Sequence, residues 1–119
     1  MHKINLSEKF DLIQDHWNPR IAGELNGQQV KLVKFKGEFI WHKHEDEDEM
    51  FFVVQGEFDM HLREKVITLR ENEFIIIPKG VEHKPVATNE VSVMLFEPAS
   101  TLNTGDKRNE MTKEKLGRI

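Results

Sequence analysis

The 119-residue sequence contains no cysteine and no tyrosine, and these two absences exclude several kinds of chemistry. Without cysteine there is no disulfide framework, no thiol nucleophile and no thiolate metal site, so a metal ion would need imidazole and carboxylate ligands. No serine stands in a recognisable nucleophile setting either. We therefore set nucleophilic hydrolysis aside.

The sequence also lacks an excess of positive charge and any long hydrophobic run. Its 17 basic residues stand against 21 acidic ones, and the net charge of -4 offers no electrostatic footprint for nucleic acid or anionic lipid. The longest apolar runs, such as FIII at 74–77, are far too short to span a membrane. The first ten residues lack the apolar core of a secretory signal. We expect a cytoplasmic protein with no nucleic-acid or membrane partner.

The chain length is near the commonest size of one domain, which predicts a single domain over 1–119. A short helical N-terminal segment is expected within 1–19, with Ser7 as its cap. Its apolar residues recur at helical spacing: Leu6, Phe10, Ile13 and Trp17. At the other end, the polar tail over 99–119 is expected to be a loop followed by a short helix from about Glu110.

Between these ends, over about 20–98, the hydrophobic period changes to two. About nine short runs follow one another, each bounded by glycine, proline, asparagine or charged turns. They are IAGEL, QQVKLVKF, KGEFIWHKH, EMFFVVQG, EFDMHLRE, KVITLREN, EFIIIPKG, EHKPVA and VSVMLFEP. No helical pattern interrupts them, so the sequence predicts an all-β fold in the form of a small antiparallel β-barrel.

The stretch WHKHEDEDEM at 41–50 places two histidines next to five consecutive acidic residues. Residues i and i+2 of a strand face the same way, so His42 and His44 can reach one ion together. Glu49 opens the next strand and is the candidate carboxylate ligand, whereas the acidic residues 45–48 are expected to lie in water. Imidazoles with one carboxylate suit a divalent Mn, Fe, Co, Ni, Cu or Zn ion rather than Ca or Mg.

Two segments resemble the sequence motifs of the cupin superfamily. The first motif is similar to the residues Gly37, His42, His44, Glu49 and Gly56. The second is similar to the stretch from Asn72 to Ala87, where a proline-x-glycine-x-x-histidine spacing is formed by Pro78, Gly80 and His83. The resemblance covers roughly the middle half of the chain. It implies an antiparallel jelly-roll β-barrel that binds one metal ion through His42, His44, Glu49 and His83.

The sequence departs from these motifs at three positions, none of which is a ligand. The gap between Gly37 and His42 is one residue shorter than the commonest pattern, and Ala87 replaces a final asparagine. Asn72 replaces the first glycine of the second motif. Asparagine is the non-glycine residue that best tolerates positive φ, so Asn72 is expected to serve the same turn. The remaining histidines, expected at the surface, are His2, His16 and His61.

The alternation of the strands also predicts the walls of a pocket around the ion. If Glu49 faces the interior, the residues on the same faces include Phe51, Val53, Ile40 and Pro85. An apolar wall around an ion is typical of a small-molecule site, and equally of the filling of any small barrel. The NTGD stretch at 103–106 is expected to be a solvated loop.

The first functional hypothesis is an enzyme that acts on a small oxygen-bearing molecule. Four protein ligands would leave two cis positions on an octahedral ion, whereas they would close a tetrahedral zinc site. Glu49 is the candidate catalytic residue, which would stay bound or detach to move a proton. The resemblance implies oxygenase, isomerase, epimerase, decarboxylase or lyase chemistry, and the fold does not choose among these. No clustered basic set favours a sugar phosphate.

Two other hypotheses stay open. The chain could be a non-catalytic metal- or ligand-binding module that serves as a sensor or as an accessory protein. Alternatively, the ion could be a structural staple, with function residing in a dimer interface built from the N-terminal segment and Trp17. The family resemblance implies a homodimer.

Overall fold

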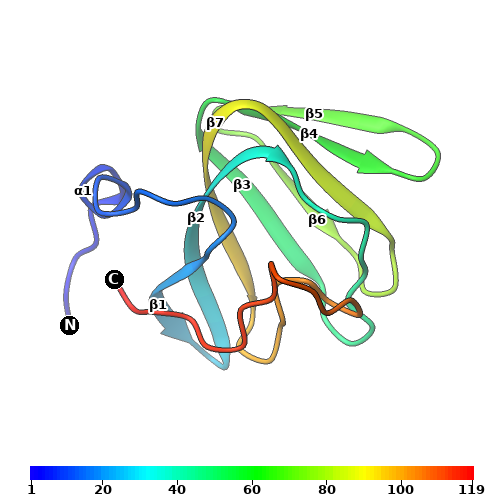
Figure 1. The fold of residues 1–119 in the computed structure, drawn as a ribbon. Helices are drawn as coiled ribbons and strands as arrows, with labels where there is room; N and C mark the ends of the chain where they lie inside the picture. Colours follow the sequence, from blue (N-terminus) through cyan, green and yellow to red (C-terminus); the bar gives the residue numbers. More distant parts are fainter.

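The computed structural model describes residues 1–119 and consists mostly of β-strands, with one short helix (Figure 1). The elements in chain order are α1 (Leu6–Phe10), β1 (Arg20–Leu25), β2 (Gln28–Glu38), β3 (Glu49–Gln55), β4 (Glu57–Leu62), β5 (Val66–Arg70), β6 (Phe74–Ile77) and β7 (His83–Pro98). The five-residue helix α1 falls far short of the length of a membrane-spanning helix.

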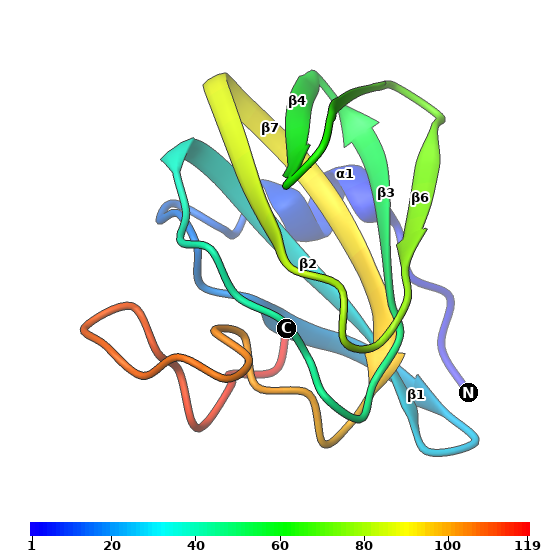
Figure 2. The ribbon, with the colours of Figure 1, turned by 90° about the vertical axis from the view of Figure 1, so that its right-hand side faces the viewer.

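Strand β7 organises the sheet, because it pairs antiparallel with three other strands. It lies beside β2 along one edge, while its first half pairs with β4 and its second half with β3. The main path runs β1-β2-β7-β3-β6, and the β4–β5 hairpin joins through β7. A register shift between Phe35 and Gly37 accompanies this change of partner. The two views show the resulting curled sheet (Figures 1 and 2).

The all-β prediction is confirmed, but two details of the strand pattern were wrong. The EHKPVA and VSVMLFEP runs form one 16-residue strand, since the polar residues 88–90 between them stay extended instead of turning. The KGEFIWHKH run is not a strand of its own, because β2 continues to Glu38 and the chain then becomes irregular. The sheet is open, since β1 and β6 end its path without pairing to each other. This arrangement is consistent with a jelly roll.

The two chain ends differ from the expected helices. The N-terminal helix is a single turn that ends at Phe10, and its cap is Asn5, whose side chain accepts a hydrogen bond from the Glu8 backbone N–H at 3.0 Å. The prediction of a helix from about Glu110 was wrong. There the side chains of Asn109 and Thr112 bond to nearby backbone N–H groups and hold turns instead, which explains the loss of helix.

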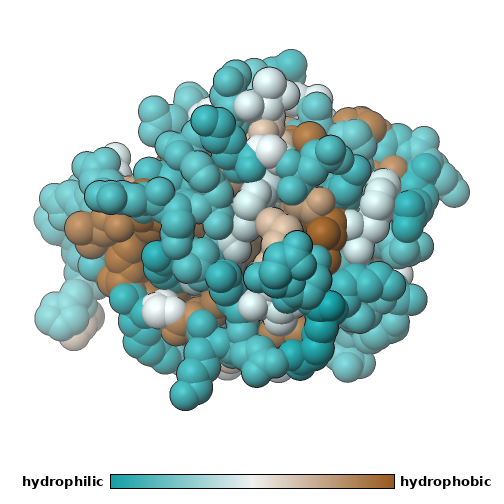
Figure 3. Space-filling view, viewed as in Figure 1, coloured by the Kyte–Doolittle hydropathy of each residue, from teal (hydrophilic) through white to brown (hydrophobic).

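Apolar side chains pack on both faces of β2. The main core includes Val33, which is fully buried between the curled parts of the sheet. On the opposite face, Leu32 packs under Phe10 and Ile13 in a second cluster. Alternation along one strand therefore attaches the N-terminal segment to the outside of the sheet. The surface seen in Figure 3 is mostly hydrophilic, with hydrophobic side chains gathered between α1 and the C-terminus.

The turn before β6 contains Asn72, which replaces the first glycine of the second motif. Asn72 has a φ of 66°, as expected for this position. Replacing it with Ala should reduce the free energy of unfolding by about 1 kcal/mol, because the alanine Cβ disfavours this left-handed conformation and no polar side chain forms a compensating local hydrogen bond. Asn72→Gly should leave the stability nearly unchanged. Urea denaturation measures both variants, and equal stability of Asn72→Ala and wild type would contradict the prediction.

Candidate metal centre

The two motif segments meet through a pair of histidines. His42 follows β2 and His83 begins β7, and the two residues form an isolated antiparallel bridge. The His42 N–H donates to the His83 carbonyl at 3.1 Å, and the His83 N–H donates to the His42 carbonyl at 2.9 Å. Their ring centroids lie 4.3 Å apart. This backbone contact places imidazoles that are far apart in sequence side by side.

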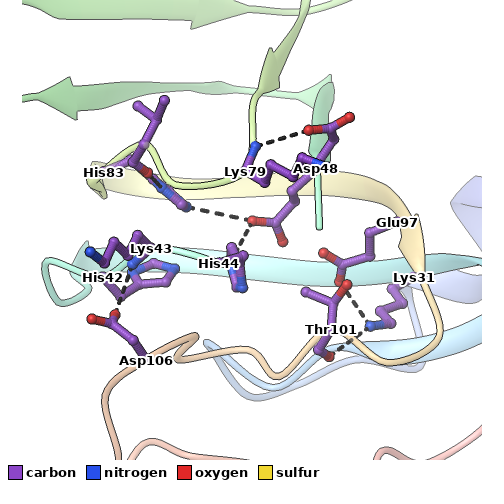
Figure 4. Close-up of polar contacts among 12 residues, drawn as sticks. Lys31, His42, Lys43, His44, Asp48, Lys79, His83, Glu97, Thr101 and Asp106 are labelled. Carbon is purple, nitrogen blue, oxygen red and sulfur yellow. Dashed lines mark hydrogen bonds and ion pairs between the residues drawn. The ribbon is translucent and has the colours of Figure 1, made fainter. Parts of the chain in front are cut away.

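His44 and Glu49 complete the cluster. Glu49 begins β3, where its backbone pairs with Ile77 of β6, and its Oε1 lies 3.1 Å from Nε2 of His44 and 3.5 Å from Nε2 of His83. Potential ligand atoms of the four residues all lie within 4.8 Å of one another, and all four side chains are buried. Figure 4 shows the histidines converging from separate segments. The structure therefore brings together the four side chains that the sequence singled out.

Hydrogen bonds to the backbone orient two of the imidazoles. Nδ1 of His42 lies 2.9 Å from the Ile40 carbonyl, and Nδ1 of His83 lies 2.9 Å from the Val81 carbonyl. Because a carbonyl only accepts, each Nδ1 carries the proton and each Nε2 keeps its lone pair. This is the tautomer that a metal-binding histidine needs.

Three atoms at the centre are buried without a hydrogen-bond partner: Nε2 of His44, Nε2 of His83 and Oε1 of Glu49. An unsatisfied buried polar atom costs about 1–3 kcal/mol, so such a concentration is unusual in a folded protein. One cation placed among them would serve all three. The donor set of imidazole nitrogens and a carboxylate oxygen thus fits a divalent transition metal.

Burial and neighbouring charge shift the titration of these groups in different directions. Burial, assisted by repulsion from His83, lowers the pKa of His42 to about 4. For His44, burial also opposes the charged form, but the adjacent Glu49 carboxylate outweighs it and the pKa is raised. Burial likewise raises the pKa of Glu49, yet the close approach of Glu97, His44 and His83 holds it well below its usual value.

A buried ion pair behind the centre was missed at the sequence level. Lys31 and Glu97 are each 2% exposed, and Lys31 Nζ donates to Glu97 Oε1 at 2.8 Å (Figure 4). Burial and the negative charge of Glu49 raise the pKa of Glu97 well above its usual value. Strand alternation indicates this burial. Lys31 lies two residues before the buried Val33, and Glu97 lies two residues after the buried Leu95, so each charged residue lies on the inward face of its strand.

An apolar cavity of about 30 Å³ reaches the centre at His42 and Glu49. Phe51 and Pro85 line it, as the alternation predicted. The assignment of Ile40 to the wall was wrong, because the strand has ended there and Phe39 instead packs edge-on against His42, with ring centroids 5.3 Å apart. Val53 is fully buried in the core rather than in the cavity wall.

Trp17 forms the outer wall of this cavity. Its ring stacks on Phe35 with a centroid separation of 4.4 Å and on Phe39 at 4.9 Å, and its indole N–H donates to the Lys36 carbonyl at 2.9 Å. Asn103, from the tail, supplies an amide to the same lining. Trp17 is half-buried and packs against aromatic side chains of its own chain.

The solvated-loop expectation was correct for most of the acidic run and wrong for the NTGD stretch. Glu45, Asp46 and Asp48 are exposed, whereas Thr104 is fully buried and Asp106 accepts a hydrogen bond from the Lys43 N–H at 3.0 Å. The tail therefore packs on the histidine segment. The three other histidines lie outside the centre: His2 is exposed, and His16 and His61 are partly exposed.

The chain belongs to the cupin family, because the model of the cupin domain matches residues 30–97. YdbB of Bacillus subtilis is 40% identical over 72 residues, which are 60% of this chain and 63% of that protein. The chain thus matches less than two thirds of this curated relative. A solved cupin-2 domain protein of Shewanella frigidimarina is 49% identical, with a TM-score of 0.79 over 80% of this chain and 93% of that one. A solved protein of Neisseria meningitidis is 33% identical, with a TM-score of 0.76 over 82% and 100% of the two chains.

The packing of the tail on the centre can be tested at Gly105. A Cβ at this position would lie 2.2 Å from the Lys43 carbonyl oxygen, and the φ of 56° also disfavours a side chain. Gly105→Ala should lower the free energy of unfolding by about 1–3 kcal/mol, as overpacking typically does. Gly117→Ala is the matched control, because its Cβ would meet only the flexible Arg20 side chain at 3.6 Å. Equal urea midpoints for the two variants would contradict this account.

The opposite pKa shifts of His42 and His44 predict two pH effects in metal-free protein. Unfolded His42 takes up a proton near 6.5 and folded His42 near 4, so the stabilisation by neutral His42 is complete above 6.5 and is lost toward pH 4, by about 3 kcal/mol. The raised pKa of His44 stabilises the fold below about pH 6.5 and this contribution fades at higher pH. Imidazole NMR titration measures both residues. Titration midpoints near pH 6.5 for both imidazoles would contradict the burial of His42 and the effect of Glu49 on His44.

Proposed function

We propose that the protein is a mononuclear metal-dependent enzyme that acts on a small oxygen-bearing molecule. The proposed ligands are His42, His44, Glu49 and His83, and the proposed ion is divalent Mn, Fe, Co, Ni, Cu or Zn. The observation that supports this most directly is the set of partnerless buried atoms on three of these residues. A jelly-roll frame and a homodimer, both implied by the family, complete the proposal.

A bound divalent cation would supply Lewis acidity and lower the pKa of a water or substrate hydroxyl. The other steps belong to the chain itself. The carbonyl bonds at Nδ1 fix the orientation of the His42 and His83 rings and direct each Nε2 toward the centre. Glu49 is the proposed catalytic residue, because its Oε1 has no hydrogen-bond partner and its lowered pKa keeps the carboxylate ionised, so that it would stay bound to the ion or detach to move a proton.

The apolar cavity supports a particular kind of substrate. No cationic side chain lines it, and its polar contributions are limited to Asn103 and the centre itself. A phosphate group would enter without a counter-charge and would lose its hydration, which is costly. We infer that the substrate has a compact apolar part that lies against Phe39 and Phe51, and an oxygen-bearing group directed at the ion.

The cavity volume favours a second candidate function, a non-catalytic binding module. A space of about 30 Å³ has room for one or two water molecules. A sensor or accessory protein would need the ion and no larger ligand. The two candidate functions differ in a property that can be measured. An enzyme converts a small molecule into a product, whereas a binding module binds the metal without converting any compound.

The metal assignment predicts a large effect of His83→Ala. Removing this imidazole should weaken Co²⁺ or Ni²⁺ binding by more than about 100-fold, since even changes outside the ligand set commonly cost 10–100-fold. His61→Ala is the matched control, because His61 lies on β4 outside the cluster. Competition titration against a chromophoric chelator measures both affinities. Equal affinities in the two variants would remove His83 from the site.

Turnover separates the two candidate functions. Metal-loaded protein is incubated with a panel of small hydroxy, keto and enol compounds, and products are followed by NMR. The enzyme proposal expects conversion by wild type and, at equal metal occupancy, at least about 100-fold slower conversion by Glu49→Gln, because the amide cannot accept the proton. Full metal occupancy without conversion of any compound in the panel would favour the binding module.

A further inference from the structure

The candidate metal centre has two approaches of opposite chemical character. The apolar cavity reaches it through His42 and Glu49. A second hollow, a groove of about 220 Å³, reaches it through His44. The groove is lined by His44, Glu45, Asp46, Glu47, Ser100 and Asp106, with Leu102 and Gly105. We refer to it as the acidic groove.

The acidic groove carries an excess of negative charge. Four carboxylates line it, and the nearest cations satisfy only part of that charge: Lys43 lies 3.1 Å from Glu45, and Lys107 lies 3.5 Å from Asp106. Glu47 accepts a hydrogen bond from the Ser100 hydroxyl at 2.8 Å, but a hydroxyl carries no charge and leaves the negative charge of Glu47 uncompensated. A concave surface lined with one sign of charge concentrates the opposite ions near it.

His44 connects the acidic groove to the centre. It is the only buried residue of the lining, with 4% of its surface exposed, and its Nε2 lies 3.1 Å from Glu49 Oε1 without a hydrogen-bond partner. Unlike His42 and His83, it makes no Nδ1 bond to a backbone carbonyl. The inner end of the groove is therefore formed by a residue whose Nε2 belongs to the candidate metal centre.

We propose that the acidic groove is the route by which the divalent cation enters the centre, with His44 as the residue that receives it. This inference rests on the proposed metal site. A hydrated dication would lose its water at the apolar cavity without compensation. Along the groove, the carboxylates of Glu45, Asp46 and Glu47 replace that water step by step. The cation and the organic ligand thus use different openings.

The rate of metal uptake tests this proposal. Metal-free protein is mixed with Co²⁺ in a stopped-flow instrument, and the visible absorption of the bound ion is followed at several salt concentrations. The triple variant Glu45→Gln, Asp46→Asn, Glu47→Gln should bind Co²⁺ about tenfold more slowly at low salt, the lower end of typical electrostatic steering. Its dissociation rate should stay within about twofold of wild type, and its association rate should lose most of the salt dependence.

A charge-matched control distinguishes the groove from net charge. The variant Glu8→Gln, Glu57→Gln, Glu64→Gln also removes three negative charges, and none of its positions lines the groove. It should keep the wild-type association rate. Equal slowing of both variants, or of neither, would overturn the entry route while leaving the metal site intact. Failure of wild type to bind Co²⁺ at all would overturn the proposed function as well.

Discussion

The structure of the centre depends on the reciprocal backbone pairing of His42 with His83. Two hydrogen bonds of 3.1 and 2.9 Å join the irregular segment after β2 to the first residue of β7. Together with the bond from the Phe39 N–H to the Pro85 carbonyl at 3.0 Å, this bridge fixes the segment before β3 relative to the long strand that organises the sheet. With it, two imidazoles lie within contact of Glu49 and His44, and each keeps its Nε2 free.

This pairing explains how the centre can be well ordered although three of its buried polar atoms lack hydrogen-bond partners. Hydrogen bonds to carbonyls, burial and packing against Phe39 hold the imidazoles in place before any ligand arrives. The atoms without partners lie close to one another, and the folded chain orients them before any ligand binds. The buried pair of Lys31 and Glu97 extends the same polar interior away from the centre.

The sequence predicted the convergence of four side chains because their spacing combines strand alternation with two short motifs, and both are local patterns. The same local evidence placed Asn72 correctly in a left-handed turn. It failed where distant packing decides the outcome. Asp106 and Thr104 belong to a stretch that looks solvated, and only the contact with Lys43 orders it. The buried pair of Lys31 and Glu97 was missed because the two residues lie 66 positions apart.

The candidate centre has two openings, a polar one at His44 and an apolar one at His42, and the roles proposed for both require a bound ion. X-ray absorption at the metal edge of the untagged, purified protein tests that central claim most directly. The account predicts one transition metal per chain, with nitrogen and oxygen neighbours at about 2.0–2.2 Å and the multiple scattering of three imidazoles. Substoichiometric metal after reloading, or a bound metal without imidazole scattering, would contradict it.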